Sequence, residues 1–158
     1  MANIYGDYVK WRYCSRFERK LLVEAWIFVC VARVCLLFFP FKWLASTIGE
    51  SMTESDSYLG VDARIRARMI SRAIGTAASR TPWKTVCLPR AIAAQWMLKR
   101  YDIAGTLYLG LAKDNTKPEN FAAHAWLRCG DMILTGYSGH ERFTVLSTFS
   151  SKCVKKFE

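Results

Sequence analysis

The first feature of the chain is a long apolar stretch at residues 15–47. Its apolar residues recur at helical spacing and also spill beyond one face, so the pattern predicts a helix that is apolar on most sides. Glu24 and Arg33 interrupt the stretch, which leaves no uncharged run of the roughly 18 residues that a membrane span needs. Pro40 is expected to end or kink this helix near Phe39.

A helix of this kind has three uses. It can pack against the domain behind it, offer a docking surface to a partner protein, or lie on a membrane surface. The acidic segment 48–57 has the composition of a linker, and residues 58–79 predict a second helix that Pro82 stops. We therefore expect an N-terminal helical extension and linker at 1–57, followed by one domain at 58–158.

The pattern changes at Cys87. Residues 87–100 predict a helix that starts at or next to Cys87, because Pro89 is tolerated only in a first helical turn. Strand-like segments follow, with turns at Gly130-Asp131 and Ser138-Gly139; they span residues 106–111, 123–128, 132–135 and 142–146. Helices followed by one helix that leads into an antiparallel meander indicate an α+β fold.

Composition narrows the class of protein. A hydrophobic content of 52% argues against disorder, and the net charge of +10 is either a solvated basic face or a surface for acidic peptide, nucleic acid or anionic lipid. No nucleic-acid-binding motif is present, so nucleic acid is not expected as a partner. The six cysteines are irregularly spaced and no signal peptide precedes them, which favours reduced thiols and a cytoplasmic protein. Neither a metal site nor a cofactor is expected from their spacing.

The candidate chemistry lies at Cys87 and His124. A helix start carries unpaired backbone N–H groups and the positive end of the helix dipole, which favour a thiolate at Cys87. His124 lies on the strand that follows, where an imidazole can take the thiol proton. A cysteine at a helix start that faces a histidine on a strand is the arrangement of papain-type catalysis, and the Cys87 N–H is a candidate oxyanion donor. The alternative is that both residues are ordinary core residues.

Several short motifs of the chain occur together in one known family. They are Pro82-Trp83, Cys87-Leu88, Gly105, Leu109-Gly110, Ala123-His124-Ala125-Trp126, Thr135-Gly136 and Glu141-Arg142-Phe143, with the hydrophobic helix that ends at Pro40-Phe41. In this combination the chain resembles the leader peptidases of lasso peptide biosynthesis, which belong to the transglutaminase-like cysteine protease superfamily. The resemblance implies a papain-like core, in which a nucleophile helix packs on a small antiparallel sheet.

The resemblance also implies roles for single residues. Cys87 is expected to be the nucleophile and His124 the base that later protonates the leaving amine. Asp131, the nearest carboxylate after His124, is the candidate third member, although a tight turn at Gly130-Asp131 would place it too far away along the strand. Such a turn would pair His124 with Tyr137. His140 is a weaker alternative base, and Trp83 and Trp126 are expected to wall the cleft or to fill the core.

The expected activity is removal of a leader from a lasso peptide precursor. The expected partners are that precursor, a separate leader-recognition protein of winged-helix type that docks on helix 20–46, and an asparagine-synthetase-like cyclase. Any ATP dependence is expected to belong to the cyclase, because this sequence contains no phosphate-binding glycine loop. Three alternatives stay open: a transglutaminase-like amidase or acyltransferase, a peptide-binding module without catalysis, and a peripheral membrane protein.

Overall fold

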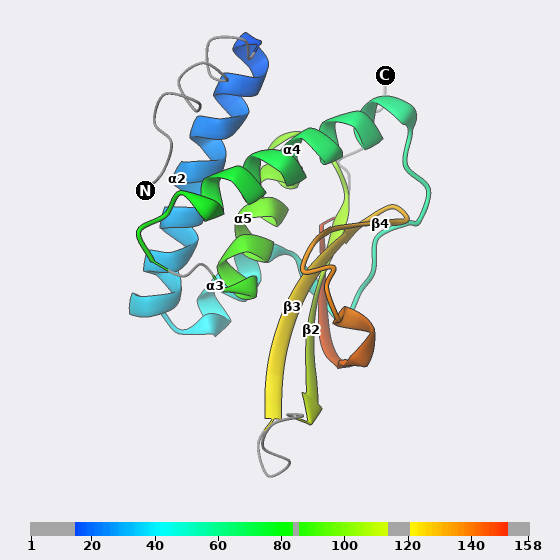
Figure 1. Cartoon of the computed structure of the whole chain (residues 1–158). Coiled ribbons are helices and arrows are strands. Elements are labelled where there is room, and N and C mark those ends of the chain that lie inside the picture. Colours follow the sequence, from blue (N-terminus) through cyan, green and yellow to red (C-terminus); the bar gives the residue numbers. More distant parts are fainter. Residues whose placement is uncertain (1–14, 84–85, 114–120, 152–158) are drawn as a thin grey trace.

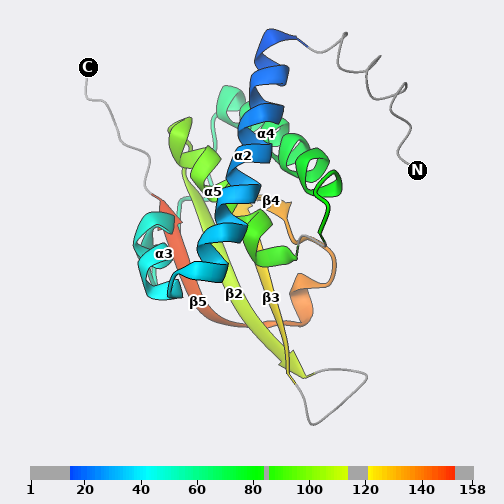
Figure 2. The same cartoon turned by 90° about the vertical axis from the view of Figure 1, so that its left-hand side faces the viewer.

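The computed structural model describes residues 15–83, 86–113 and 121–151. Its helices come before the main strands in the chain and gather on one side of the sheet (Figures 1 and 2). The helices are α2 (Arg16–Phe38), α3 (Phe41–Ile48), α4 (Val61–Ser79) and α5 (Cys87–Arg100). The strands are β1 (Glu50–Ser51), β2 (Gly105–Lys113), β3 (Phe121–Cys129), β4 (Met132–Thr135) and β5 (Thr144–Ser151), with a 3₁₀ turn, η1 (His140–Arg142), before β5. The predicted α+β class is confirmed.

The long apolar helix begins and ends where its sequence dictates. Ser15 and Glu18 form a capping box, which satisfies backbone N–H groups at the start of α2. Phe39 is extended and Pro40 is the N-cap of the next helix, so the proline divides the apolar stretch into α2 and α3. One face of α2 packs into the core through Leu21, Ala25, Val29 and Ala32. By length and composition alone, α2 could cross a membrane.

The opposite face of α2 remains uncovered. Trp26, Val34 and Leu37 are 49%, 49% and 62% exposed. Trp43, on the next helix α3, is 65% exposed. Exposed apolar surface of this extent marks an interaction site more often than a solvated face.

The strands form one antiparallel sheet in the order β1-β5-β2-β3-β4. The prediction of a meander is therefore wrong, because β5 pairs with β2 and not with β4. The connection after β4, residues 136–143, instead crosses the sheet, and its Phe143 lies against Gly110 of β2. Two residues in this connection, Gly136 and Gly139, have a φ of +74°, a conformation that glycine allows. The predicted linker also contributes the short edge strand β1.

Helix α5 is the central element on the helix side of the sheet. It packs against α2, α3 and α4 and against β2, β3 and β4. Ala91, Ile92, Ala94 and Leu98 of α5 are fully buried, and on β3 the alternate residues Ala125, Leu127 and Cys129 face this core. The start of α5 is therefore held firmly against the sheet.

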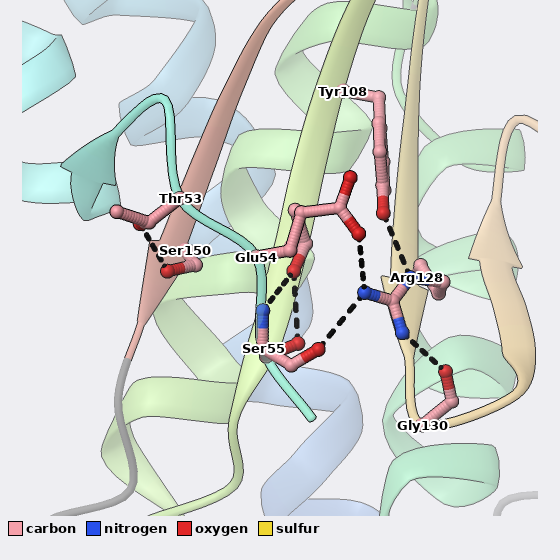
Figure 3. Close-up of polar contacts among 8 residues, drawn as sticks. Thr53, Glu54, Ser55, Tyr108, Arg128, Gly130 and Ser150 are labelled. Carbon is pink, nitrogen blue, oxygen red and sulfur yellow. Dashed lines mark hydrogen bonds and ion pairs between the residues drawn. The ribbon is translucent and has the colours of Figure 1, made fainter. Parts of the chain in front are cut away.

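The other side of the sheet carries His124, Trp126 and Arg128 of β3. Arg128 donates from Nε to the Tyr108 hydroxyl at 2.8 Å and from Nη2 to Glu54 at 3.1 Å and to the Ser55 carbonyl at 2.9 Å (Figure 3). Its Nη1 donates to the Gly130 carbonyl at 2.8 Å. These bonds hold Glu54 and Ser55 across the sheet on the side away from the helices.

Candidate active site

Cys87 is the first residue of α5. The N-cap residue, Val86, makes no side-chain cap, and the first turn holds no acidic residue. Val86 thus leaves the backbone N–H groups at this end of α5 without an N-cap side chain, and they can stabilise negative charge on the sulfur or on a bound substrate. Cys87 is partly exposed, so a reagent or substrate can reach its sulfur.

His124 lies on β3 opposite Gly110 of β2. Its ring is 4.9 Å from the ring of Phe143 and 5.9 Å from that of Trp126, measured between centroids. Trp126 in turn stacks on Tyr108 at 5.4 Å with the two ring planes 3° apart. A series of aromatic side chains therefore fixes the orientation of the imidazole.

The Nε2 atom of His124 lies 2.9 Å from the carbonyl oxygen of Gly136. A carbonyl oxygen only accepts hydrogen bonds, so Nε2 must carry the hydrogen and donate it. The neutral imidazole then has its lone pair on Nδ1. This tautomer leaves Nδ1 as the ring nitrogen that can take a proton.

Gly136 can accept this bond because it lacks a side chain. A Cβ at this position would lie 2.5 Å from the Ala125 carbonyl oxygen and 2.8 Å from the Trp126 Cβ, and the φ of +74° disfavours other residues. The preceding residues are anchored by Ser71 of α4, whose hydroxyl donates to the Leu134 carbonyl at 2.6 Å. The packing of α4 on β4 thus sets the position of the carbonyl that orients His124.

Cys87 and His124 line one cavity of about 380 Å³. The other lining residues are Arg90, Leu134, Thr135, Gly136, Tyr137 and Ser138. The cavity lies where β4 ends at Thr135, because the pairing of β3 with β4 covers only Leu127–Cys129. The structure therefore brings together the cysteine and the histidine that the sequence singled out.

The structure does not bring Asp131 to this cavity. Gly130 and Asp131 form the predicted two-residue turn, with Cys129 opposite Met132. The Asp131 carboxylate pairs with the Arg64 guanidinium at 2.7 Å, and its side chain is 59% exposed. The group that forms a hydrogen bond with the His124 imidazole is the Gly136 carbonyl. It is a backbone group, so the pattern of side chains in the sequence does not reveal it.

The expected pairing of His124 with Tyr137 is also not observed. The register shifts by one residue between Leu127 and Arg128, so that Leu127 lies opposite Thr135 and Arg128 opposite Ile133. Strand β4 ends at Thr135, so no residue of β4 lies opposite His124. The imidazole instead meets the carbonyl of Gly136, the first residue after the strand.

Three further residues were candidates for the site, and none of them lines the cavity. His140 donates from Nδ1 to the Tyr137 carbonyl at 2.6 Å, and its ring packs on Trp126. Trp126 is 5% exposed and belongs to the aromatic stack behind His124. Trp83 is 36% exposed, and the next two residues, 84 and 85, lie outside the described part of the chain.

Two other described cysteines, Cys30 and Cys129, lie away from the candidate site. Burial raises the pKa of Cys129 to about 11, and burial also raises the pKa of Cys30. Neither thiol lines the cavity. Cys14 and Cys153 lie outside the described residues.

A cysteine that begins a central helix, and a histidine on the antiparallel sheet behind it, define the papain-like class of arrangement. A sequence profile of the Transglutaminase-like superfamily matches residues 35–148, and the chain belongs to that superfamily. Its members are in general cysteine proteases or acyltransferases. Searches of curated proteins and of solved structures found no match. The matched region begins inside α2, and the boundary predicted between residues 57 and 58 stays a prediction.

Proposed function

We propose that the protein is a cysteine peptidase that removes the leader from a lasso peptide precursor. One observation carries the catalytic part of the proposal: Cys87 and His124 line the same cavity, and the hydrogen bond of Nε2 to Gly136 leaves Nδ1 free to accept a proton. The precursor specificity rests on the motifs of the sequence, above all Ala123-His124-Ala125-Trp126 with Thr135-Gly136.

The reaction follows from these positions. The Cys87 thiol gives its proton to His124 Nδ1, and the sulfur attacks the carbonyl carbon of the scissile amide. N–H groups at the start of α5 stabilise the negative oxygen that forms. The imidazolium then protonates the leaving amine as the C–N bond breaks, which leaves a thioester on Cys87. A water that transfers a proton to His124 hydrolyses the thioester and releases the leader carboxylate.

The Gly136 carbonyl takes the part that a carboxylate plays in a three-residue site. It accepts the Nε2 hydrogen and so fixes the tautomer and the ring orientation of His124. A neutral carbonyl stabilises the imidazolium less than a carboxylate does, because it has no net charge. We therefore expect catalysis that depends strongly on how the partner protein presents the precursor.

The test is cleavage of a precursor followed by mass spectrometry. Sequencing the genes beside this one comes first, and a short precursor reading frame and a winged-helix recognition protein found there are the substrate and the partner to supply. We expect two fragments whose masses add up to the precursor plus one water. Cys87→Ala and His124→Ala should abolish cleavage, whereas Cys35→Ala, which changes a free thiol outside the cavity, should retain it.

Added amine donors separate the peptidase from an acyltransferase. If glycine amide or hydroxylamine is incorporated at the cleaved carbonyl and hydrolysis is absent without it, the enzyme is an acyltransferase that uses the same two residues. If Cys87→Ala keeps full function in precursor maturation, the cavity binds peptide without catalysis, and the proposal fails.

We propose the uncovered face of α2 as the docking site for the separate recognition protein, in the cytoplasm. The face is apolar and exposed at Trp26, Val34 and Leu37, and the other face of the same helix already packs in the core. Val34→Lys should abolish co-purification with that protein and leave the melting temperature unchanged. Ile65→Lys on α4, where Ile65 is 53% exposed, is the matched control. Flotation of the wild type with liposomes would point to a membrane instead.

A further inference from the structure

Two residues that line the cavity each carry a buried polar atom that makes no hydrogen bond with another described residue. In the part of the chain that the structure describes, three buried side-chain nitrogen or oxygen atoms lack a hydrogen bond: Arg90 Nε, Thr135 Oγ1 and Gln95 Oε1. Two of these, on Arg90 and Thr135, belong to residues that line the cavity beside Cys87. Leaving a buried polar group unpaired costs about 1–3 kcal/mol, so such groups are rare and call for an explanation.

Thr135 is the more buried of the two residues. It is 6% exposed, yet its hydroxyl meets no acceptor or donor among the described residues. The position is set by the end of β4, directly before Gly136, whose carbonyl orients His124. The hydroxyl oxygen is itself closed to water in this structure, so a ligand in the cavity reaches it when the side chains of the lining shift.

Arg90 brings a positive charge to the same place. It lies three residues after Cys87 on α5, so the two side chains share one face of the helix. Among the residues that the structure describes, no aspartate or glutamate lines the cavity, and none of their ion pairs includes Arg90. A cation near the start of a helix is also disfavoured by the helix dipole. Arg90 is therefore poorly explained as a residue that stabilises α5.

We propose that Arg90 and Thr135 form a subsite for a carboxylate of the peptide substrate, next to the scissile bond. The Arg90 Nε–H and the Thr135 hydroxyl both donate, and a carboxylate accepts two such bonds while it neutralises the guanidinium. A neutral amide would leave that charge unbalanced. The inference rests on the proposed peptidase function and adds to it the class of substrate: peptides with an acidic side chain or a free carboxylate close to the cleaved bond.

Alkylation of Cys87 tests this subsite without knowledge of the precursor. Iodoacetate carries a carboxylate on the carbon that reacts with sulfur, and iodoacetamide is its neutral counterpart. We expect the ratio of their rates at Cys87, measured by peptide mapping, to exceed the ratio for free cysteine by about tenfold, as one charge-assisted hydrogen bond allows. Arg90→Met should return the ratio to that of free cysteine, and Thr135→Val should lower it by a smaller factor.

Two controls make the result specific. Arg66→Met removes an exposed arginine of α4 outside the cavity, so it reports on the general positive field and should leave the ratio unchanged. The melting temperature of Arg90→Met should be equal to that of the wild type or higher, because the substitution removes an unpaired buried nitrogen.

The outcomes for the subsite and for the peptidase are distinct. If Cys87 reacts with iodoacetamide but the ratio matches free cysteine, or if Arg90→Met leaves a raised ratio intact, the carboxylate subsite is wrong and the peptidase proposal stands. If Cys87 is inert to both reagents, the subsite is tested in Cys87→Ser by nuclear magnetic resonance. The Arg90 Nε–H signal should then shift saturably with N-acetylglycine and not with N-acetylglycinamide, and an equal response to both would overturn the inference.

Discussion

The two sides of the sheet are built by different means. On the helix side, Ala125 and Leu127 of β3 pack against α5 in a core of aliphatic side chains. On the other side, Arg128 binds Glu54 and Ser55 through hydrogen bonds, and Trp126 and His124 lie under the connection 136–143. The first side depends on hydrophobic burial, which has no preferred direction. The second depends on directed contacts at fixed distances.

This difference matters because the candidate site uses both sides. Cys87 comes from α5 on the helix side, and His124 comes from the other side of β3. They meet at the end of β4, where the sheet no longer separates the two sides. The helix side therefore determines whether the protein folds, and the directed contacts determine whether the imidazole is oriented.

The largest loss of stability is expected on the helix side. Leu127 is fully buried, and Leu127→Ala should lower the free energy of unfolding by about 2–5 kcal/mol, since it removes buried methyl groups and leaves a cavity. Urea denaturation measures the effect. Leu146→Ala on β5, where Leu146 is 56% exposed, should change stability by about 0.5 kcal/mol or less. Equal losses for the two variants would contradict the assignment of the core.

The next effect is expected at the turn that orients His124. Gly136→Ala forces a Cβ to within 2.5 Å of the Ala125 carbonyl oxygen, and the positive φ adds about 1–2 kcal/mol. We expect cleavage to fall by more than the stability loss explains, because the acceptor of Nε2 moves. Gly139→Ala is the matched control: it has the same φ of +74°, but its Cβ meets only Arg142 Nε at 3.9 Å. If both variants cleave equally well, the Gly136 carbonyl does not orient the histidine.

A smaller effect is expected where a polar contact is built into the helix side. The Tyr101 hydroxyl donates to Glu24 at 2.8 Å. Burial, as the larger cause, and this hydrogen bond together raise the pKa of Tyr101 to about 12. The folded state holds this proton more tightly than the unfolded state, so the contact stabilises the fold below pH 10 and is lost as pH rises toward 12. Tyr101→Phe should cost about 0.5–1.5 kcal/mol at pH 7.

Denaturation at several pH values checks this sign. Between pH 10 and 12, the stability of Tyr101→Phe should fall less steeply than that of the wild type. Tyr58→Phe changes a tyrosine that is 87% exposed and should follow the wild-type curve. Parallel curves for Tyr101→Phe and the wild type would show that the Glu24 contact does not form in solution.

The comparison of the two sides also explains what the sequence could predict. Helix α5 begins at Cys87 and β4 spans Met132–Thr135 as expected, because hydrophobic periodicity and Pro89 determine those bounds. The pairing of β5 with β2 could not be predicted in this way. The crossing connection is held by the contact of Phe143 with Gly110 and by the packing of the Phe143 ring on His124, and such contacts follow no periodic sequence pattern.

The residues of the candidate site also divide into those that the sequence could predict and those that it could not. Cys87 and His124 carry side-chain chemistry and could be chosen from the sequence. The Gly136 carbonyl could not, because every residue has a carbonyl, and this one meets the imidazole where the chain turns directly after β4. The unpaired atoms of Arg90 and Thr135 become visible only when burial and neighbours are known.

The smallest effect is expected at Asp131, the carboxylate that the sequence favoured as third member. Its partner is Arg64 at 2.7 Å, and both side chains are more than a third exposed, so Asp131→Asn should lower stability by about 1 kcal/mol or less. Cleavage by this variant should stay within about twofold of the wild type, since the substituted side chain does not line the cavity. If instead Asp131 oriented His124, the same substitution would lower kcat by roughly 10⁴-fold. Initial rates for Asp131→Asn and Gly136→Ala, measured side by side on one precursor, would therefore decide which group orients the imidazole.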